Sequence, residues 1–194
     1  MLGSHFGSLE MVRAMASYRA MSRVTAVVYT EHAQRFNSML THASEAFRRG
    51  MLEIADIGPD TAMLLKQRID AGDLLVIVGD RVPVASQRTV DVRFFGETAS
   101  VAQGPYVLAH LLGCPVYLIF CPEEEGKYRL YLERFAERIT LPRRDREVAI
   151  ARYAQRFADR LEHHCRKAPL QWFNFYDFWR QRETAQVTKD QPHD

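Results

Sequence analysis

The sequence has few cysteines, little net charge and no long apolar run. Its three cysteines are widely spaced and form no Cys-x-x-Cys pair, so neither a disulfide framework nor a zinc ribbon is indicated. A net charge of +2 is too small to indicate nucleic-acid binding. The most apolar stretch, 107–121, is shorter than the roughly 20 residues of a membrane-spanning helix, and the first residues do not read as a signal peptide. We therefore expect one folded domain in a reducing, cytoplasmic setting, whose membrane contact is peripheral or supplied by residues outside this chain.

Short apolar runs alternate with helical patterns along most of the chain. Buried strands are expected at 24–29, 51–55, 74–78, 90–95 and 116–120, and a strand at a sheet edge at 128–135. Helices are expected at 33–47, from Pro59 to Gly72, from Gly104 to Gly113, and after Pro142. This alternation is typical of an α/β fold in which helices cover a mixed sheet.

The sharpest local pattern is His5-Phe6-Gly7-Ser8-Leu9-Glu10. An apolar stripe begins at Leu9, so His5 is expected on the turn that enters a helix. From the first turns of that helix, Glu10 can reach back to one imidazole nitrogen and leave the other free as a base. Gly3 and Gly7 permit a tight turn, so that nearby amides could stabilise an oxyanion. A histidine and a glutamate at this spacing also occur by chance in many proteins, so the pair alone decides nothing.

The block from His5 to Glu10 resembles the H-x4-D/E signature of the glycerolipid and lysophospholipid acyltransferase superfamily, and more narrowly that of its lipid A late acyltransferase branch. Other segments resemble the same branch in the same order. They are 27–37 (VVYTEHAQRFN), 74–81 (LLVIVGDR), 92–96 (VRFFG), 103–105 (QGP), 114–116 (CPV) and 168–179 (APLQWFNFYDFW). The resemblance covers about residues 2–180.

The resemblance implies transfer of a fatty acyl group from an acyl carrier protein or coenzyme A thioester to a lipid hydroxyl, without a metal, a cofactor or a covalent acyl-enzyme. It implies that His5 is the general base and Glu10 its partner, in a peripheral protein at the cytoplasmic face of the bacterial inner membrane. The positions matched to substrate binding are Gly7, Ser8, Asp80, Arg81, Arg93, Phe94 and Gly96.

Two of these positions have an alternative interpretation. The planar guanidinium of Arg81 suits a phosphate or an acceptor oxygen, but it can equally pair with Asp80. Phe94 can shape an acyl or acceptor pocket, or it can be an ordinary core residue at a strand end.

The resemblance assigns residues 1–180 to a catalytic domain that lacks the first strand and the membrane-anchor helix of the family, followed by a polar tail at 181–194. Without that strand His5 is less well supported, so a non-catalytic lipid-binding fragment stays open as an alternative. A thioester or lipid hydrolase is the second alternative, because a histidine–acid pair can also activate water. The sequence has neither the G-x-S-x-G nor the H-E-x-x-H motif of common hydrolases.

Two further features are compatible with membrane contact. Aromatic residues crowd into 172–179, where they suit either a membrane interface or a segment packed over the sheet. Arg152, Arg156 and Arg160 repeat along the helix after Pro142. They suit an acidic carrier protein, anionic lipid headgroups, or a solvated face interleaved with acids.

Overall fold

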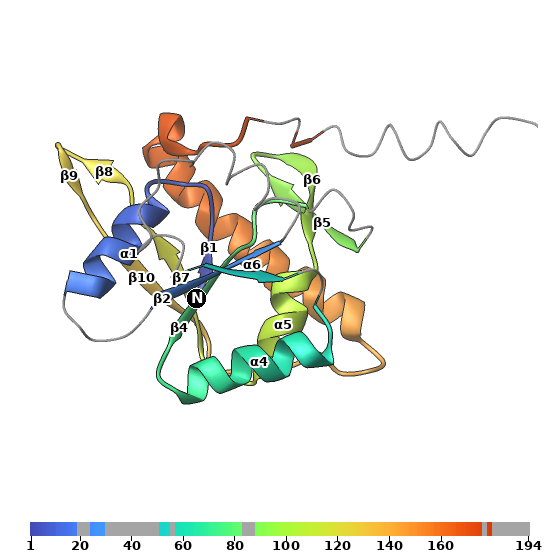
Figure 1. The fold of residues 1–194 in the computed structure, drawn as a ribbon. Helices are drawn as coiled ribbons and strands as arrows, with labels where there is room; N and C mark the ends of the chain where they lie inside the picture. The colour runs from blue at the N-terminus through green and yellow to red at the C-terminus, as the bar shows by residue number, and fades with distance from the viewer. Residues whose placement is uncertain (19–23, 30–50, 55–56, 83–87, 176–177, 180–194) are drawn as a thin grey trace, which may run out of the picture.

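The computed structural model describes residues 1–18, 24–29, 51–54, 57–82, 88–175 and 178–179. Its main sheet has the strand order β10-β7-β1-β4-β2-β3 (Figure 1). All neighbouring strands are parallel except β10, which runs antiparallel to β7 at one edge. The strands are β1 (Leu2–Gly3), β2 (Val24–Tyr29), β3 (Met51–Ile54), β4 (Leu74–Val78), β7 (Val116–Phe120) and β10 (Tyr131–Ala136).

Two hairpins and four helices complete the described fold. The hairpins pair β5 (Thr89–Phe94) with β6 (Glu97–Ala102), and β8 (Glu123–Glu124) with β9 (Lys127–Tyr128). The helices are α1 (Leu9–Tyr18), α4 (Pro59–Asp70), α5 (Gly104–Leu112) and α6 (Arg146–Lys167), and a 3₁₀ turn follows at Pro169–Gln171.

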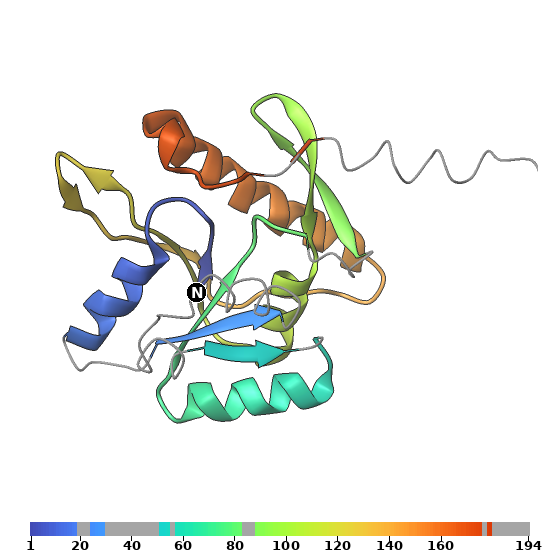
Figure 2. The same cartoon turned by 45° about the horizontal axis from the view of Figure 1, so that its top comes forward.

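Helices cover both faces of the sheet, as the side-chain alternation of the strands requires. In β4, Leu75 belongs to the cluster formed with α4 and α5, whereas the next residue, Val76, packs in the cluster that contains Val12 of α1. Figures 1 and 2 show α4 and α5 side by side, and the β5–β6 hairpin standing against α6. The expected α/β fold with a mixed, helix-covered sheet is therefore confirmed.

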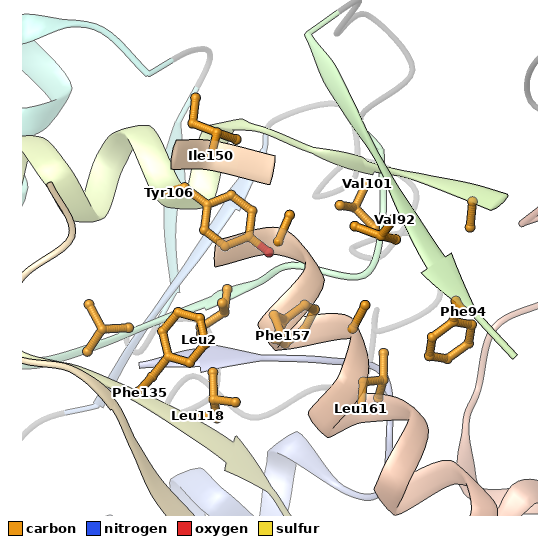
Figure 3. Close-up of a cluster of buried hydrophobic side chains, with 14 of the residues drawn as sticks. Leu2, Val92, Phe94, Val101, Tyr106, Leu118, Phe135, Ile150, Phe157 and Leu161 are labelled. Atoms are coloured by element: carbon orange, nitrogen blue, oxygen red, sulfur yellow. The ribbon is translucent and has the colours of Figure 1, made fainter. Parts of the chain in front are cut away.

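The largest core cluster lies between the sheet, α6 and the β5–β6 hairpin (Figure 3). Leu2 and Leu118 enter it from the sheet, and Phe157 enters it from α6. The helix α6 has an apolar stripe that is buried at Ile150, Ala154, Phe157, Leu161 and Cys165. An amphipathic helix with this stripe gains its stability from packing on the sheet rather than from helix propensity alone.

Most expected elements match, with differences at their boundaries. The strand expected at 90–95 ends at Phe94, because the chain turns at Phe95, whose φ is 53°. After this turn, β6 pairs with β5, and the sequence did not predict the strand β6. The edge strand expected from residue 128 begins at Tyr131, because the preceding residues form the β8–β9 hairpin. The helix expected at 33–47 lies outside the described residues.

A two-residue strand leads into His5. Leu2 and Gly3 form β1, which is hydrogen-bonded between β4 and β7 at the centre of the sheet. The segment before His5 is therefore short but is anchored on both sides.

Candidate active site

His5 and Asp80 follow two neighbouring parallel strands. In the register of β1 and β4, Leu2 is opposite Ile77 and Gly3 is opposite Val78. Each strand ends just before a polar side chain, His5 after β1 and Asp80 after β4. The carboxyl ends of parallel strands meet at one edge of a sheet, which is where ligand sites form in open α/β folds. The sheet register thus brings two residues that are far apart in the sequence to one place.

The Asp80 carboxylate holds His5 by two hydrogen bonds. The His5 main-chain N–H donates to Oδ2 at 2.8 Å, and the ring Nδ1 lies 2.9 Å from Oδ1. Asp80 is completely buried, whereas the His5 side chain is 28% exposed. A proton on Nδ1 that is shared with the carboxylate leaves Nε2 as the unprotonated nitrogen. The pair therefore has the geometry of an oriented general base.

A third donor reaches the same carboxylate from the end of the chain. The indole Nε1–H of Trp172 donates to Asp80 Oδ2 at 3.0 Å. Burial alone would raise the pKa of Asp80, but the hydrogen bonds from His5 and Trp172 outweigh burial and hold the pKa below its ordinary value. Asp80 is thus an ionised carboxylate at neutral pH.

Glycine and serine shape the loop that carries His5. Gly7 has a φ of 71° and lies against the main chain of Cys121, at the end of β7. The Ser8 N–H donates to the Cys121 carbonyl at 2.9 Å, and the Ser8 Oγ accepts from the Met11 N–H at the start of α1. These contacts fix where the loop stops and the helix begins.

Residues 169–175, which we call the C-terminal strap, cover the other side of this loop (Figure 2). The Gly7 N–H donates to the Gln171 carbonyl, and the Phe173 N–H donates to the His5 carbonyl, both at 2.8 Å. The main-chain N–H groups of Gly7 and Ser8 both donate to main-chain carbonyls. Neither N–H is therefore available for the oxyanion role that the sequence had suggested for amides of this turn.

The acid that the structure shows at the His5 ring is Asp80. Asp80 bonds to Nδ1 of His5, whereas Glu10 is exposed in the first turn of α1. The sequence had assigned the orienting role to Glu10, and it placed Asp80 among the substrate-binding residues. A catalytic role for Glu10 stays a prediction.

The remaining predicted binding residues fall at two places. Arg81 lies at the strap, where its Nη2 donates to the Phe173 carbonyl at 3.2 Å. Phe94 is buried, and its ring packs in a T-shaped contact against the indole of Trp172, with the ring centroids 5.0 Å apart. Arg93 is tied by its main chain to Gln155 of α6, and Gly96 lies in the exposed turn of the β5–β6 hairpin.

A cavity of about 270 Å³ reaches the amino-terminal ends of β4 and β7. Its lining includes Leu75 at the start of β4, Tyr117 near the start of β7, and Leu108 and Leu112 of α5. Neither His5 nor Asp80 lines this cavity.

One protein-family model matches most of the chain. The family model described as bacterial lipid A biosynthesis acyltransferase matches residues 1–181. The chain belongs to this family. The lipid A acyltransferase family acts by acyl transfer in lipid A biosynthesis, so membership supports an enzyme that acylates a lipid. No curated protein matches the sequence closely enough to count as a relative. In the described part of this lipid A acyltransferase family member, no helix is long and apolar enough to cross a membrane.

Proposed function

We propose that this protein transfers a fatty acyl group from an acyl carrier protein or coenzyme A thioester to a hydroxyl of a glycolipid or other lipid acceptor. The observation that carries the proposal is the His5 ring, whose Nδ1 is held by a buried carboxylate while the side chain stays partly open to solvent. An imidazole in this state is a general base that needs neither a metal nor a covalent intermediate.

The chemistry follows from that arrangement. Nε2 of His5 takes the proton of the acceptor hydroxyl as its oxygen attacks the carbonyl carbon of the thioester. A C–O bond forms, the C–S bond breaks, and the departing sulfur takes the proton back from the imidazolium. Asp80 stabilises the imidazolium between these two steps, because its negative charge faces Nδ1.

Arg81 supports binding of an anionic acceptor. It directly follows Asp80 and reaches the strap through the Phe173 carbonyl, so its guanidinium is at the same end of the sheet as His5. A planar guanidinium binds phosphate oxygens well. We therefore infer that the Arg81 guanidinium binds a phosphate of a substrate or the oxyanion that develops during the reaction.

The outer side of the strap supports peripheral contact with a lipid surface. Leu170 is 92% exposed, Phe173 45% and Phe175 87%, whereas Trp172 and Asn174 between them are half-buried. The exposed cations Arg166 and Lys167 end α6 just before this segment. Apolar side chains beside cations suit the interface of an anionic bilayer. This face would place His5 near its lipid acceptor.

Acyl transfer is tested with radiolabelled acyl carrier protein thioester and acyl-coenzyme A, each incubated with bacterial lipid and the purified protein. We expect labelled lipid from one donor and at least a hundredfold loss, about the contribution of a general base, in His5→Ala. His163→Ala, which changes an exposed histidine of α6, is the matched control and should keep full transfer. Retained transfer in His5→Ala would exclude His5 as the base. If the folded protein only releases free fatty acid from the thioesters, it is a hydrolase; if it does neither, the lipid-binding alternative takes precedence.

Lipid contact is tested by co-sedimentation with anionic phosphatidylglycerol vesicles. Leu170→Asp and Phe175→Asp should each weaken binding about tenfold, because a carboxylate replaces apolar surface at the bilayer. Val148→Asp provides the control, since Val148 is an exposed apolar residue at the other end of α6. Equal binding by all three variants would show that the strap is not the contact surface.

A further inference from the structure

Trp172 links the end of the described chain to the carboxylate that holds His5. Its indole Nε1 lies 3.0 Å from Asp80 Oδ2, across 92 positions of the sequence. The ring is fixed by T-shaped contacts with Phe94 and Phe178, at centroid distances of 5.0 and 5.1 Å. Such aromatic contacts restrict the orientation of the indole as well as burying it. The N–H is therefore aimed at Asp80 by its surroundings.

The main chain of the strap prevents Trp172 from moving independently of His5. Phe6 and Trp172 form an isolated antiparallel bridge, with the bonds from Gly7 and to His5 on either side. The Gln171 side chain also pairs with the main chain of Glu123, donating to its carbonyl and accepting from its N–H, both at 2.7 Å. The strap, the His5 loop and the segment after β7 thus form one connected unit.

The donors from His5 and Trp172 divide between the two oxygens of Asp80. Oδ2 accepts from the His5 amide and from the Trp172 indole, which leaves Oδ1 to face the imidazole. The indole adds a second hydrogen bond to Oδ2 beside that of the His5 amide, and this bond further opposes rotation of the carboxylate about its Cβ–Cγ bond. Hydrogen bonds to an ionised group are the strong ones. The orientation of the His5 ring therefore depends on the indole through Asp80.

We propose that Trp172 is a positioning residue, whose indole N–H fixes the Asp80 carboxylate so that His5 presents an unprotonated Nε2 to the acceptor hydroxyl. The expected effect on catalysis rests on the proposed function. The fixing of Asp80 and His5 by the indole does not depend on it. The sequence alone placed Trp172 only in a general aromatic cluster.

The test compares Trp172→Phe with Trp179→Phe. Both variants remove one indole donor from the same aromatic cluster, but Trp179 donates to the Phe94 carbonyl rather than to a carboxylate. We expect Trp172→Phe to lower kcat for acyl transfer about tenfold with KM for the donor unchanged, and Trp179→Phe to stay within about twofold of the parent. An unchanged kcat in a folded Trp172→Phe protein would overturn the proposal.

A spectroscopic measurement keeps the inference testable if no acyl transfer is found. In ¹⁵N spectra of the ring nitrogens, His5 should show a single Nδ1–H tautomer in the parent and in Trp179→Phe, and a mixture of tautomers in Trp172→Phe. In the parent protein, the indole proton of Trp172 should be far downfield and protected from exchange with solvent. A Trp172 proton that exchanges as fast as a free indole would overturn the proposal, even if Trp172→Phe does not fold.

Discussion

Gly7 lies directly against the main-chain carbonyl of Cys121. A Cβ at Gly7 would overlap with the carbonyl group, and the φ of 71° is one that side-chain-bearing residues rarely adopt. The next residue, Ser8, donates a hydrogen bond from its main-chain N–H to the same carbonyl. It fixes the His5 loop to the end of β7, so the position of the imidazole depends on the absence of a side chain two residues later.

Gly7→Ala should therefore destabilise the protein by about 3 kcal/mol, the sum of the backbone strain and the displacement of Cys121. The control is Gly126→Ala, because Gly126 has a similar φ of 74° but open space around it. That variant should lose only about 1 kcal/mol. Urea unfolding of the three proteins measures both values. Equal losses in the two variants would mean that the contact with Cys121 does not constrain the loop.

The second prediction separates the two acids that could orient His5. Asp80→Asn should lower kcat at least a hundredfold, because a neutral amide cannot stabilise the imidazolium. Glu10→Gln should leave kcat within about fivefold, because Asp80 accepts the hydrogen bond from His5 Nδ1. Steady-state acyl transfer of both variants decides the question. A larger loss in Glu10→Gln than in Asp80→Asn would return the orienting role to Glu10.

The third prediction concerns acid stability. Glu133 accepts two hydrogen bonds from Arg160, at 2.7 and 2.8 Å, and one from buried His164 at 2.9 Å. The hydrogen bonds from Arg160 are the largest cause, and together with the bond from His164 they outweigh partial burial and lower the pKa of Glu133 to about 2. Because this pKa is below the ordinary 4.5, unfolding takes up a proton between these values. The stabilisation is complete above pH 4.5 and disappears as the pH falls towards 2.

Glu133→Gln should accordingly be less stable than the parent at pH 7, by about 2 kcal/mol once solvent screening is allowed for. The difference should shrink steadily between pH 4.5 and 2. Urea unfolding at pH 7, 4.5 and 2.5 measures it. Glu137→Gln is the control, because Glu137 pairs with exposed Arg134 on the surface and its replacement should change little at any pH. A constant difference across the pH range would contradict the prediction.

The fourth prediction concerns the thiols. Cys121 and Cys165 are buried, whereas Cys114 is partly exposed. Burial raises the pKa of Cys121, and burial followed by the charges of Asp80 and Glu162 raises that of Cys165 to about 12. Since the thiolate is the reactive form, a thiol reagent at pH 8 should label Cys114 within minutes and the other two only after urea is added. Rapid labelling of all three without urea would show that the core around α6 opens readily.

The fold was largely predictable because most strands and helices have a local signature. The run at 74–78 is apolar on both sides, as a central strand requires, and β4 has those bounds. Pro59 and Gly113 mark a helix start and a helix end. The strand β6 (Glu97–Ala102) has no such signature. Its first two residues, Glu97 and Thr98, are polar and exposed, and the turn at Phe95 and Gly96 folds the strand back onto β5.

The site was predictable only in part. His5 was predicted from its motif, and Asp80 was predicted as a substrate-binding residue from the resemblance of residues 74–81 to the family. That the two residues touch depends on the pairing of β1 with β4, which joins positions 75 apart and leaves no local trace in the sequence. Trp172 is further still from Asp80, and its neighbours are also aromatic. Nothing in the spacing of the cluster distinguishes the one indole that reaches the carboxylate.

The C-terminal strap also determines when the site can form during synthesis. Every strand of the described sheet precedes α6, so the sheet can assemble on a chain that has not yet reached Trp172. The loop carrying His5, however, gains its bonds to Gln171 and Phe173 only after these residues have left the ribosome. Contacts between distant positions are slow to form in any case. The strands of the sheet are therefore synthesised before the segment that fixes the His5 loop.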